Sequence, residues 1–157
     1  MTLCFISKVI CFENVEFLKP KNGTFMEKSL IILKPDCMQR KLAGQVISKL
    51  ENVGLKPIAC KIINLDDNLL KEHYSHLTHL PFFPEIVEFM SSSPVMVIIF
   101  EGENAVERIR NILGPTDSQK APAGTIRGDF GLDKMRNIAH ASDSKDAAEK
   151  EIARFFK

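Results

Sequence analysis

The sequence predicts an α+β domain built on a four-stranded antiparallel sheet, and three observations support this fold class. The 157 residues, 45% hydrophobic and 26% charged, are typical of one globular domain with a substantial core. Short apolar segments alternate with segments whose apolar residues recur at helical spacing. The resulting order, β-α-β-α-α-β-α-loop-β-α, fits a split βαβ, ferredoxin-like arrangement with added helices and a long loop before the last strand.

The first part of this pattern consists of two strands separated by one helix. A short apolar strand is expected at residues 29–33, where Lys34-Pro35-Asp36 interrupts it. Residues 42–53 have the apolar spacing of a helix, which Gly54 ends. We expect a long strand over residues 55–65 to follow.

The middle of the chain predicts two helices and then a strand. Residues 66–77 form the first helix, with Asp66 or Asp67 as its N-cap. Residues 81–90 form a second, shorter helix. The run at 94–100 is rich in valine and isoleucine and is therefore expected to be a strand.

The last part predicts a helix, a loop, a strand and a closing helix. Residues 104–113 have helical spacing, whereas 114–130 begins with many glycines and prolines and is expected to be a long functional loop. A last strand is expected within 137–141. The closing helix, 144–156, has an apolar stripe and a favourable Asp146–Lys150 pair.

Residues 1–25 differ from the rest of the chain and end in a turn-like segment, Lys19-Pro20-Lys21-Asn22-Gly23. We expect the folded domain to span 26–157, with residues 1–25 as an N-terminal extension of uncertain role. These residues are an appendage, a segment added by an upstream start codon, or an extra strand or arm packed on the domain.

Composition excludes several classes of partner. The formal net charge of +1 provides no field to attract nucleic acid or an anionic membrane, although Phe82, Phe83 and scattered lysines would otherwise suit nucleic-acid binding. No segment has transmembrane length or the features of a signal peptide. The four cysteines lack metal-site spacing and favour a reducing compartment. We therefore expect a cytoplasmic protein.

The segment from Asn137 to Ser144 is the richest in chemistry. It places His140 just before a helix start dense in hydroxyls and carboxylates, which suggests phosphoryl transfer through a phosphohistidine. No P-loop or G-x-G-x-x-G motif occurs, so phosphate ligands must come from dispersed residues. Asn137 and His140 would lie on opposite faces of a strand, whereas a turn would allow both to reach one ligand. The candidate phosphate ligands are Lys34, Arg110, Thr116 and Arg127.

Three further histidines, His73, His76 and His79, form an H-x-x-H-x-x-H run. On a helix, the first and second of these share a face, but the third is rotated far round, so three-point metal coordination is poor. We expect them to be helix-surface residues.

Six motifs in order make the chain resemble the nucleoside diphosphate kinases over roughly residues 27–157. They are Lys34-Pro35-Asp36, Gln39-Arg40, Lys71-Glu72-His73-Tyr74, Pro81-Phe82-Phe83, Gly124-Thr125-Ile126-Arg127-Gly128-Asp129-Phe130 and Asn137-x-x-His140-x-Ser142-Asp143-Ser144. The resemblance implies transfer of the γ-phosphate of a nucleoside triphosphate, mainly ATP, to a nucleoside diphosphate by a ping-pong mechanism. A catalytically inactive relative that acts as an interaction module is the alternative.

The resemblance also implies a role for each matching residue. The roles are His140 as the phosphohistidine nucleophile, Glu151 as the carboxylate that orients it, Ser142 as that carboxylate's hydroxyl partner, Lys34 and Tyr74 near the transferred phosphate, Arg110, Thr116 and Arg127 as phosphate ligands, Asn137 as the ribose contact and Phe82 as the aromatic on which the base stacks. The resemblance further implies Mg²⁺ bound through phosphate oxygens and water rather than a side-chain cage, and a homo-oligomer, hexameric or tetrameric.

Several positions depart from the family pattern, among them Ala123, which stands where a proline is usual. Cys37 and Ala141 replace glycines, and Ala141 would be strained if its φ were positive. Lys134 and Met135 stand where smaller or aliphatic residues commonly flank the base.

Overall fold

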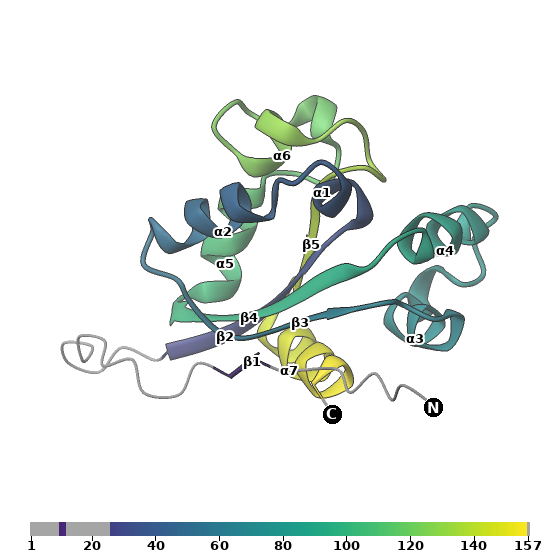
Figure 1. Ribbon diagram of the computed structural model, residues 1–157, viewed down its shortest axis with the longest axis horizontal. Coiled ribbons are helices and arrows are strands. Elements are labelled where there is room, and N and C mark those ends of the chain that lie inside the picture. The colour runs from purple at the N-terminus through teal and green to yellow at the C-terminus, as the bar shows by residue number, and fades with distance from the viewer. Residues whose placement is uncertain (1–9, 12–25, 157) are drawn as a thin grey trace, which may run out of the picture.

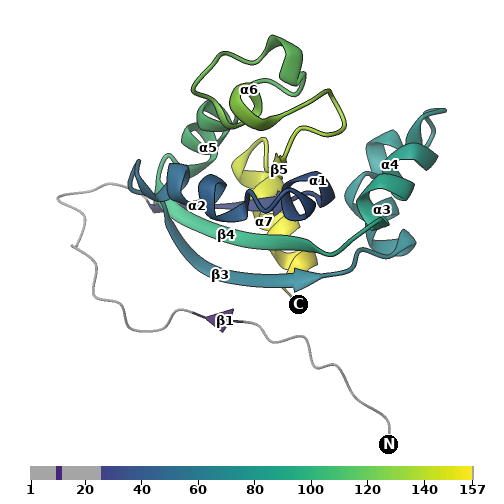
Figure 2. The ribbon, with the colours of Figure 1, turned by 45° about the horizontal axis from the view of Figure 1, so that its top comes forward.

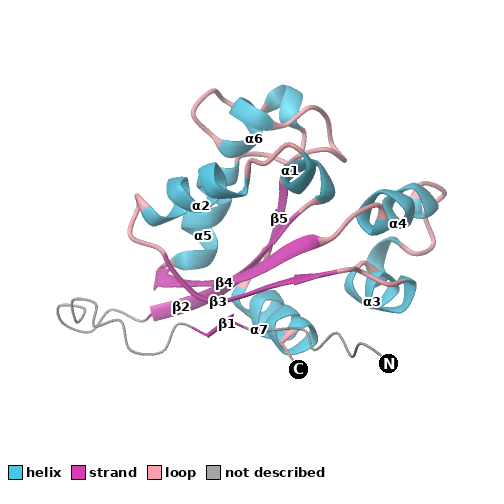
Figure 3. Cartoon of the chain, in the orientation of Figure 1, coloured by secondary structure: helices cyan, strands magenta, loops and turns pink. Residues whose placement is uncertain are grey.

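A computed structural model describes residues 10–11 and 26–156, and the predicted elements account for most of it (Figures 1 and 3). In chain order the elements are β1 (Ile10–Cys11), β2 (Met26–Leu33), α1 (Pro35–Gln39), α2 (Ala43–Glu51), β3 (Lys56–Ile63), α3 (Asp67–His73), a 3₁₀ turn (Ser75–Leu77), α4 (Phe83–Ser91), β4 (Val95–Glu103), α5 (Ala105–Leu113), a second 3₁₀ turn (Ser118–Lys120), α6 (Ile126–Phe130), β5 (Ala139–Ala141) and α7 (Lys145–Phe155).

The sheet has the order β1-β3-β4-β2-β5, and every pair is antiparallel. The four predicted strands occupy β3-β4-β2-β5, the order of a split βαβ arrangement, so the predicted fold class is confirmed. The two-residue strand β1 adds a fifth member beside β3, where Ile10 pairs with Cys60 and Cys11 with Ala59. The other residues of the expected extension lie outside the described part of the chain.

Both faces of the central strands are covered by helices. In β2, Ile31 and Leu33 pack into a core with residues of α2 and α5, while Leu30 and Ile32 pack into a second core with residues of α3, α4 and α7. Figures 1 and 2 show α7 on the opposite side of the sheet from α2 and α5. Burial on two faces explains why β2 ends in an uninterrupted apolar run rather than an alternating one.

The structure differs from the expected elements at several points. Lys34-Pro35-Asp36 starts the short helix α1 instead of only ending the strand, because proline suits the first turn of a helix. The expected loop 114–130 contains the second 3₁₀ turn and α6. The helix expected at 66–77 divides at Tyr74 into α3 and a 3₁₀ turn, and Asp66 is its N-cap, accepting from the backbone N–H of Leu69 at 2.8 Å. Within the described residues, no helix is both long and apolar enough to cross a membrane.

Candidate active site

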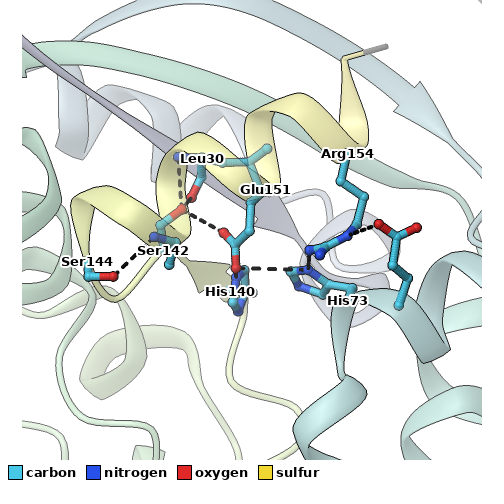
Figure 4. Close-up of polar contacts among 9 residues, drawn as sticks. Leu30, His73, His140, Ser142, Ser144, Glu151 and Arg154 are labelled. Carbon is cyan, nitrogen blue, oxygen red and sulfur yellow. Dashed lines mark hydrogen bonds and ion pairs between the residues drawn. The ribbon is translucent and has the colours of Figure 1, made fainter.

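Strand β5 and helix α7 bring three of the predicted site residues together (Figure 4). His140 lies in the middle of β5, and Ser142 follows that strand. Glu151, in the second turn of α7, points back at both: its Oε1 lies 3.0 Å from Nε2 of His140, and its Oε2 accepts from Oγ of Ser142 at 2.6 Å. The N-cap Ser144, whose Oγ accepts from the N–H of Ala147, starts α7 where this approach is possible.

The electrostatics of Glu151 favour an ionised carboxylate. Burial alone would raise the pKa of Glu151, but the hydrogen bonds that its carboxylate accepts from His140 and from the hydroxyl of Ser142 lower it overall. An ionised carboxylate only accepts hydrogen bonds, so Nε2 of His140 carries the proton that it donates to Glu151. The other ring nitrogen, Nδ1, then presents a lone pair, which is the form a nucleophilic imidazole needs.

His73 packs against this pair, contrary to the expectation that it lies on a helix surface. The residue is 7% exposed, and its ring meets the ring of His140 edge to face at 4.6 Å. Burial and the nearby positive charges lower its pKa to about 3, so His73 is neutral. Arg154 donates to Nδ1 of His73 at 3.4 Å and also pairs with Glu72. His76 and His79, in contrast, are exposed as expected. The spacing of the three histidines in the sequence does not show that His73, the last residue of α3, is buried.

Among the described residues, His73, His140 and Glu151 form the one group whose metal-ligating atoms converge, within 4.8 Å of one another. Several ligating atoms of this group are already engaged, because Glu151 bonds to Nε2 of His140 and the Arg154 guanidinium lies at Nδ1 of His73. Two imidazoles also suit Zn²⁺ better than Mg²⁺, which prefers oxygen ligands. The group therefore does not fit as a side-chain cage for Mg²⁺.

Lys34 and Tyr74 approach the site from β2 and α3. Nζ of Lys34 donates to Oδ1 of Asn137 at 2.7 Å and to the carbonyl of Met135 at 3.1 Å. Burial and the charge of Arg127 lower the pKa of Lys34 to about 8. The ring of Tyr74 lies 6.3 Å from that of His140, and burial raises its pKa, so its hydroxyl stays protonated.

The backbone just before His140 is a turn, which resolves the two alternatives for Asn137. Ile138 has φ of 75°, and the N–H of Ala139 donates to the carbonyl of Asn137 at 2.9 Å, closing a three-residue γ-turn. A β-branched residue in this left-handed region is an outlier that costs about 1–3 kcal/mol. The turn interrupts the regular strand alternation that would set Asn137 and His140 on opposite faces.

Arg127 braces this turn from α6. Its guanidinium donates to the carbonyls of Asn137 at 3.3 Å, Ala139 at 2.7 Å and Gly114 at 2.8 Å. Burial and the charge of Arg110 lower the pKa of Arg127 to about 10, which leaves it charged at neutral pH. Arg110 and Arg127, both predicted phosphate ligands, therefore lie close enough for their positive charges to repel each other. A bound anion would reduce this repulsion.

Thr116 and Phe82 are less closely tied to the histidine. The carbonyl of Thr116 accepts from Nδ2 of Asn137 at 2.8 Å, while its side chain is exposed. Phe82, just before α4, is 43% exposed.

A cleft of about 860 Å³ separates α4 from the loop after α5, and it is lined by residues such as Phe89, Asp117, Lys134 and Met135. None of the predicted site residues lines this cleft. Met135 does line it, and the carbonyl of Met135 also accepts a hydrogen bond from Lys34.

The departures from the family pattern are accommodated in different ways. Ala141 lies in β5, where the backbone is extended, so no strain arises at this residue. Cys37 is buried in the core beside α2 and α5, and burial raises the pKa of its thiol to about 12. Lys134 and Met135 both line the cleft.

Comparison with known proteins identifies the family. The model of the family described as nucleoside diphosphate kinase matches residues 27–157. A nucleoside diphosphate kinase of Methanobrevibacter smithii is 45% identical over 131 residues, covering 83% of this chain and 87% of the relative, and one of Saccharomyces cerevisiae is 46% identical, covering 83% and 86%. The chain therefore belongs to the nucleoside diphosphate kinase family.

Solved structures agree with this assignment. The Halobacterium salinarum nucleoside diphosphate kinase in complex with CDP superposes with a TM-score of 0.82 at 41% identity, covering 85% of this chain and 89% of that one. The Aquifex aeolicus enzyme gives 0.81 at 40% identity, covering 85% and 96%. The chain is a phosphotransferase that moves phosphate between nucleoside triphosphates and diphosphates, and the inactive alternative finds no support.

Proposed function

We propose that His140 is the nucleophile of this reaction and carries the phosphate between two nucleotides. The observation that carries the proposal is the bond from Nε2 of His140 to Glu151, which directs the lone pair of Nδ1 away from the carboxylate. In the first half-reaction Nδ1 forms a bond to the γ-phosphorus as the bond to the β-γ bridging oxygen breaks, and the diphosphate leaves. In the second half-reaction a diphosphate oxygen attacks the same phosphorus, and His140 is regenerated.

The remaining residues position and neutralise the phosphates, which is most of what phosphoryl transfer requires. The positive charges of Lys34, Arg110 and Arg127 suit the phosphate oxygens, and the Tyr74 hydroxyl stays protonated as a donor. Thr116 is assigned to the phosphates and Asn137 to the ribose. An exposed Phe82 suits stacking with any base, because every base has a π-face.

Mg²⁺ is proposed to arrive with the nucleotide and to neutralise its phosphate oxygens. The described side chains do not form an oxygen cage: Asp133 beside the cleft, for example, is already bonded to Arg136 and to two backbone N–H groups. We also propose that the catalytic domain spans 26–157 and that the protein is a cytoplasmic homo-oligomer. The free thiols of Cys37 and Cys60 suit a reducing compartment.

The test is to incubate the protein with γ-labelled ATP and Mg²⁺ and to examine the label on the protein. The proposal expects acid-labile, alkali-stable label that added GDP discharges to give GTP. His140→Asn is expected to take up no label, while the matched exposed variant His79→Asn labels normally. Labelling of His140→Asn at the wild-type rate would contradict the assignment.

A further inference from the structure

The strained turn at Ile138 is held at both of its backbone polar groups by one short segment. The N–H of Ile138 donates to Oδ2 of Asp36 at 3.0 Å, and the carbonyl of Ile138 accepts from the backbone N–H of Lys34 at 2.9 Å. Pro35 lies between the two partners and fixes the backbone φ there. The start of α1 therefore holds both backbone polar groups of Ile138, which lies between Asn137 and His140 in the chain.

Asp36 is an unusual partner for a backbone amide because its carboxylate is buried, with 5% of the residue exposed. A buried carboxylate is costly unless it is well bonded, yet Oδ1 of Asp36 has no hydrogen-bond partner among the described residues. Its Oδ2 bond reaches across 102 positions of sequence to Ile138. Among the described residues, the one hydrogen bond to this carboxylate therefore comes from the backbone two residues before His140.

We propose that Asp36 is a positioning residue: its bond to Ile138 holds the left-handed turn that sets Asn137 and His140 on one ligand. This inference rests on the proposed roles of those two residues. Without the bond, Ile138 relaxes toward the extended backbone that β-branched residues prefer, and strand alternation then rotates Asn137 away from the face of His140. The nucleophile stays intact, but the nucleotide is no longer aligned with it.

A second effect of Asp36 has to be separated from the first. The negative charge of Asp36 also opposes the burial that lowers the pKa of Lys34. Asparagine separates the two effects, because its side-chain oxygen can still accept from Ile138 while its charge is lost. Alanine removes both the acceptor and the charge.

The experiment compares two phosphate donors on wild type, Asp36→Asn and Asp36→Ala. ATP must be aligned by Asn137, whereas phosphoramidate is too small to reach both residues and reports only the reactivity of His140. We expect Asp36→Ala to be labelled by ATP at least 10-fold more slowly than wild type, with phosphoramidate labelling within about 2-fold. Asp36→Asn should retain ATP labelling within about 3-fold.

The matched control is Asp66→Ala, which also removes a carboxylate that accepts a backbone N–H, at the start of α3. It is expected to lower the melting temperature without changing the ratio of the two labelling rates. Unchanged ATP labelling in Asp36→Ala, an equal loss with both donors, or an equal loss in Asp36→Asn would overturn the inference. If wild type is labelled by neither donor, the proposed function itself fails.

Discussion

His140 and Glu151 lie 11 residues apart in sequence and 3.0 Å apart in space, with Nε2 of the imidazole donating to Oε1 of the carboxylate. This single contact determines which ring nitrogen is available to a phosphate. It depends on two local features, the end of β5 and the start of α7 at Ser144, which together turn the chain back on itself.

Replacement of Glu151 by Gln is expected to slow phosphorylation of His140 by about 10- to 100-fold, because a hydrogen bond to a charged group contributes about 1.5–3 kcal/mol. Rapid-quench measurement of label transfer from ATP checks this. Glu149→Gln changes an exposed carboxylate on the same helix and serves as the control. Equal rates in Glu151→Gln and wild type would show that the carboxylate does not orient the imidazole.

Loss of the proton from Lys34 should produce the alkaline limb in the profile of kcat/KM against pH. Its pKa is lowered to about 8, so the side chain is charged below that pH and neutral above it. We expect kcat/KM, which reports the free enzyme, to fall as the pH rises through about 8. Lys34→Arg keeps its charge to much higher pH and should lose this limb; persistence of the limb in that variant would assign it to another group.

His73 should make the fold less stable in acid. Its pKa is about 3 in the folded protein and 6.5 as the ordinary value, so between these values the unfolded chain binds a proton that the folded chain does not. Stability is therefore lost as the pH falls below about 6.5, by up to about 1.4 kcal/mol per pH unit. Urea unfolding of His73→Phe should show a shallower pH dependence than wild type, and parallel curves would contradict the burial argument.

Gly128 should tolerate no side chain. A Cβ there would collide with the carbonyls of Ala121 and Pro122, so Gly128→Ala is expected to lower the free energy of unfolding by about 1–3 kcal/mol. Gly44, in α2, has open space at the same position, and Gly44→Ala should be neutral or stabilising by up to about 1 kcal/mol. Denaturant unfolding of the two variants tests the difference, and equal effects would argue against the close contact.

Periodicity predicted the strands and helices well where one face of an element is buried. It failed where backbone geometry is set by distant contacts. The short helices α1 and α6 have too few residues to show a period, and the last strand is shortened because Ile138 leaves the extended conformation. His73 was expected at a surface because its spacing with His76 and His79 says nothing about which side of α3 faces α7.

The sequence by itself determined the order of elements, the family and the residue types that make the chemistry, because motifs and apolar spacing are local properties of the chain. Only the tertiary structure decided that Asp36 reaches Ile138 and that the ring of His73 packs against the ring of His140. These contacts join residues far apart in sequence, and their geometry depends on how the helices pack on the sheet rather than on any one segment.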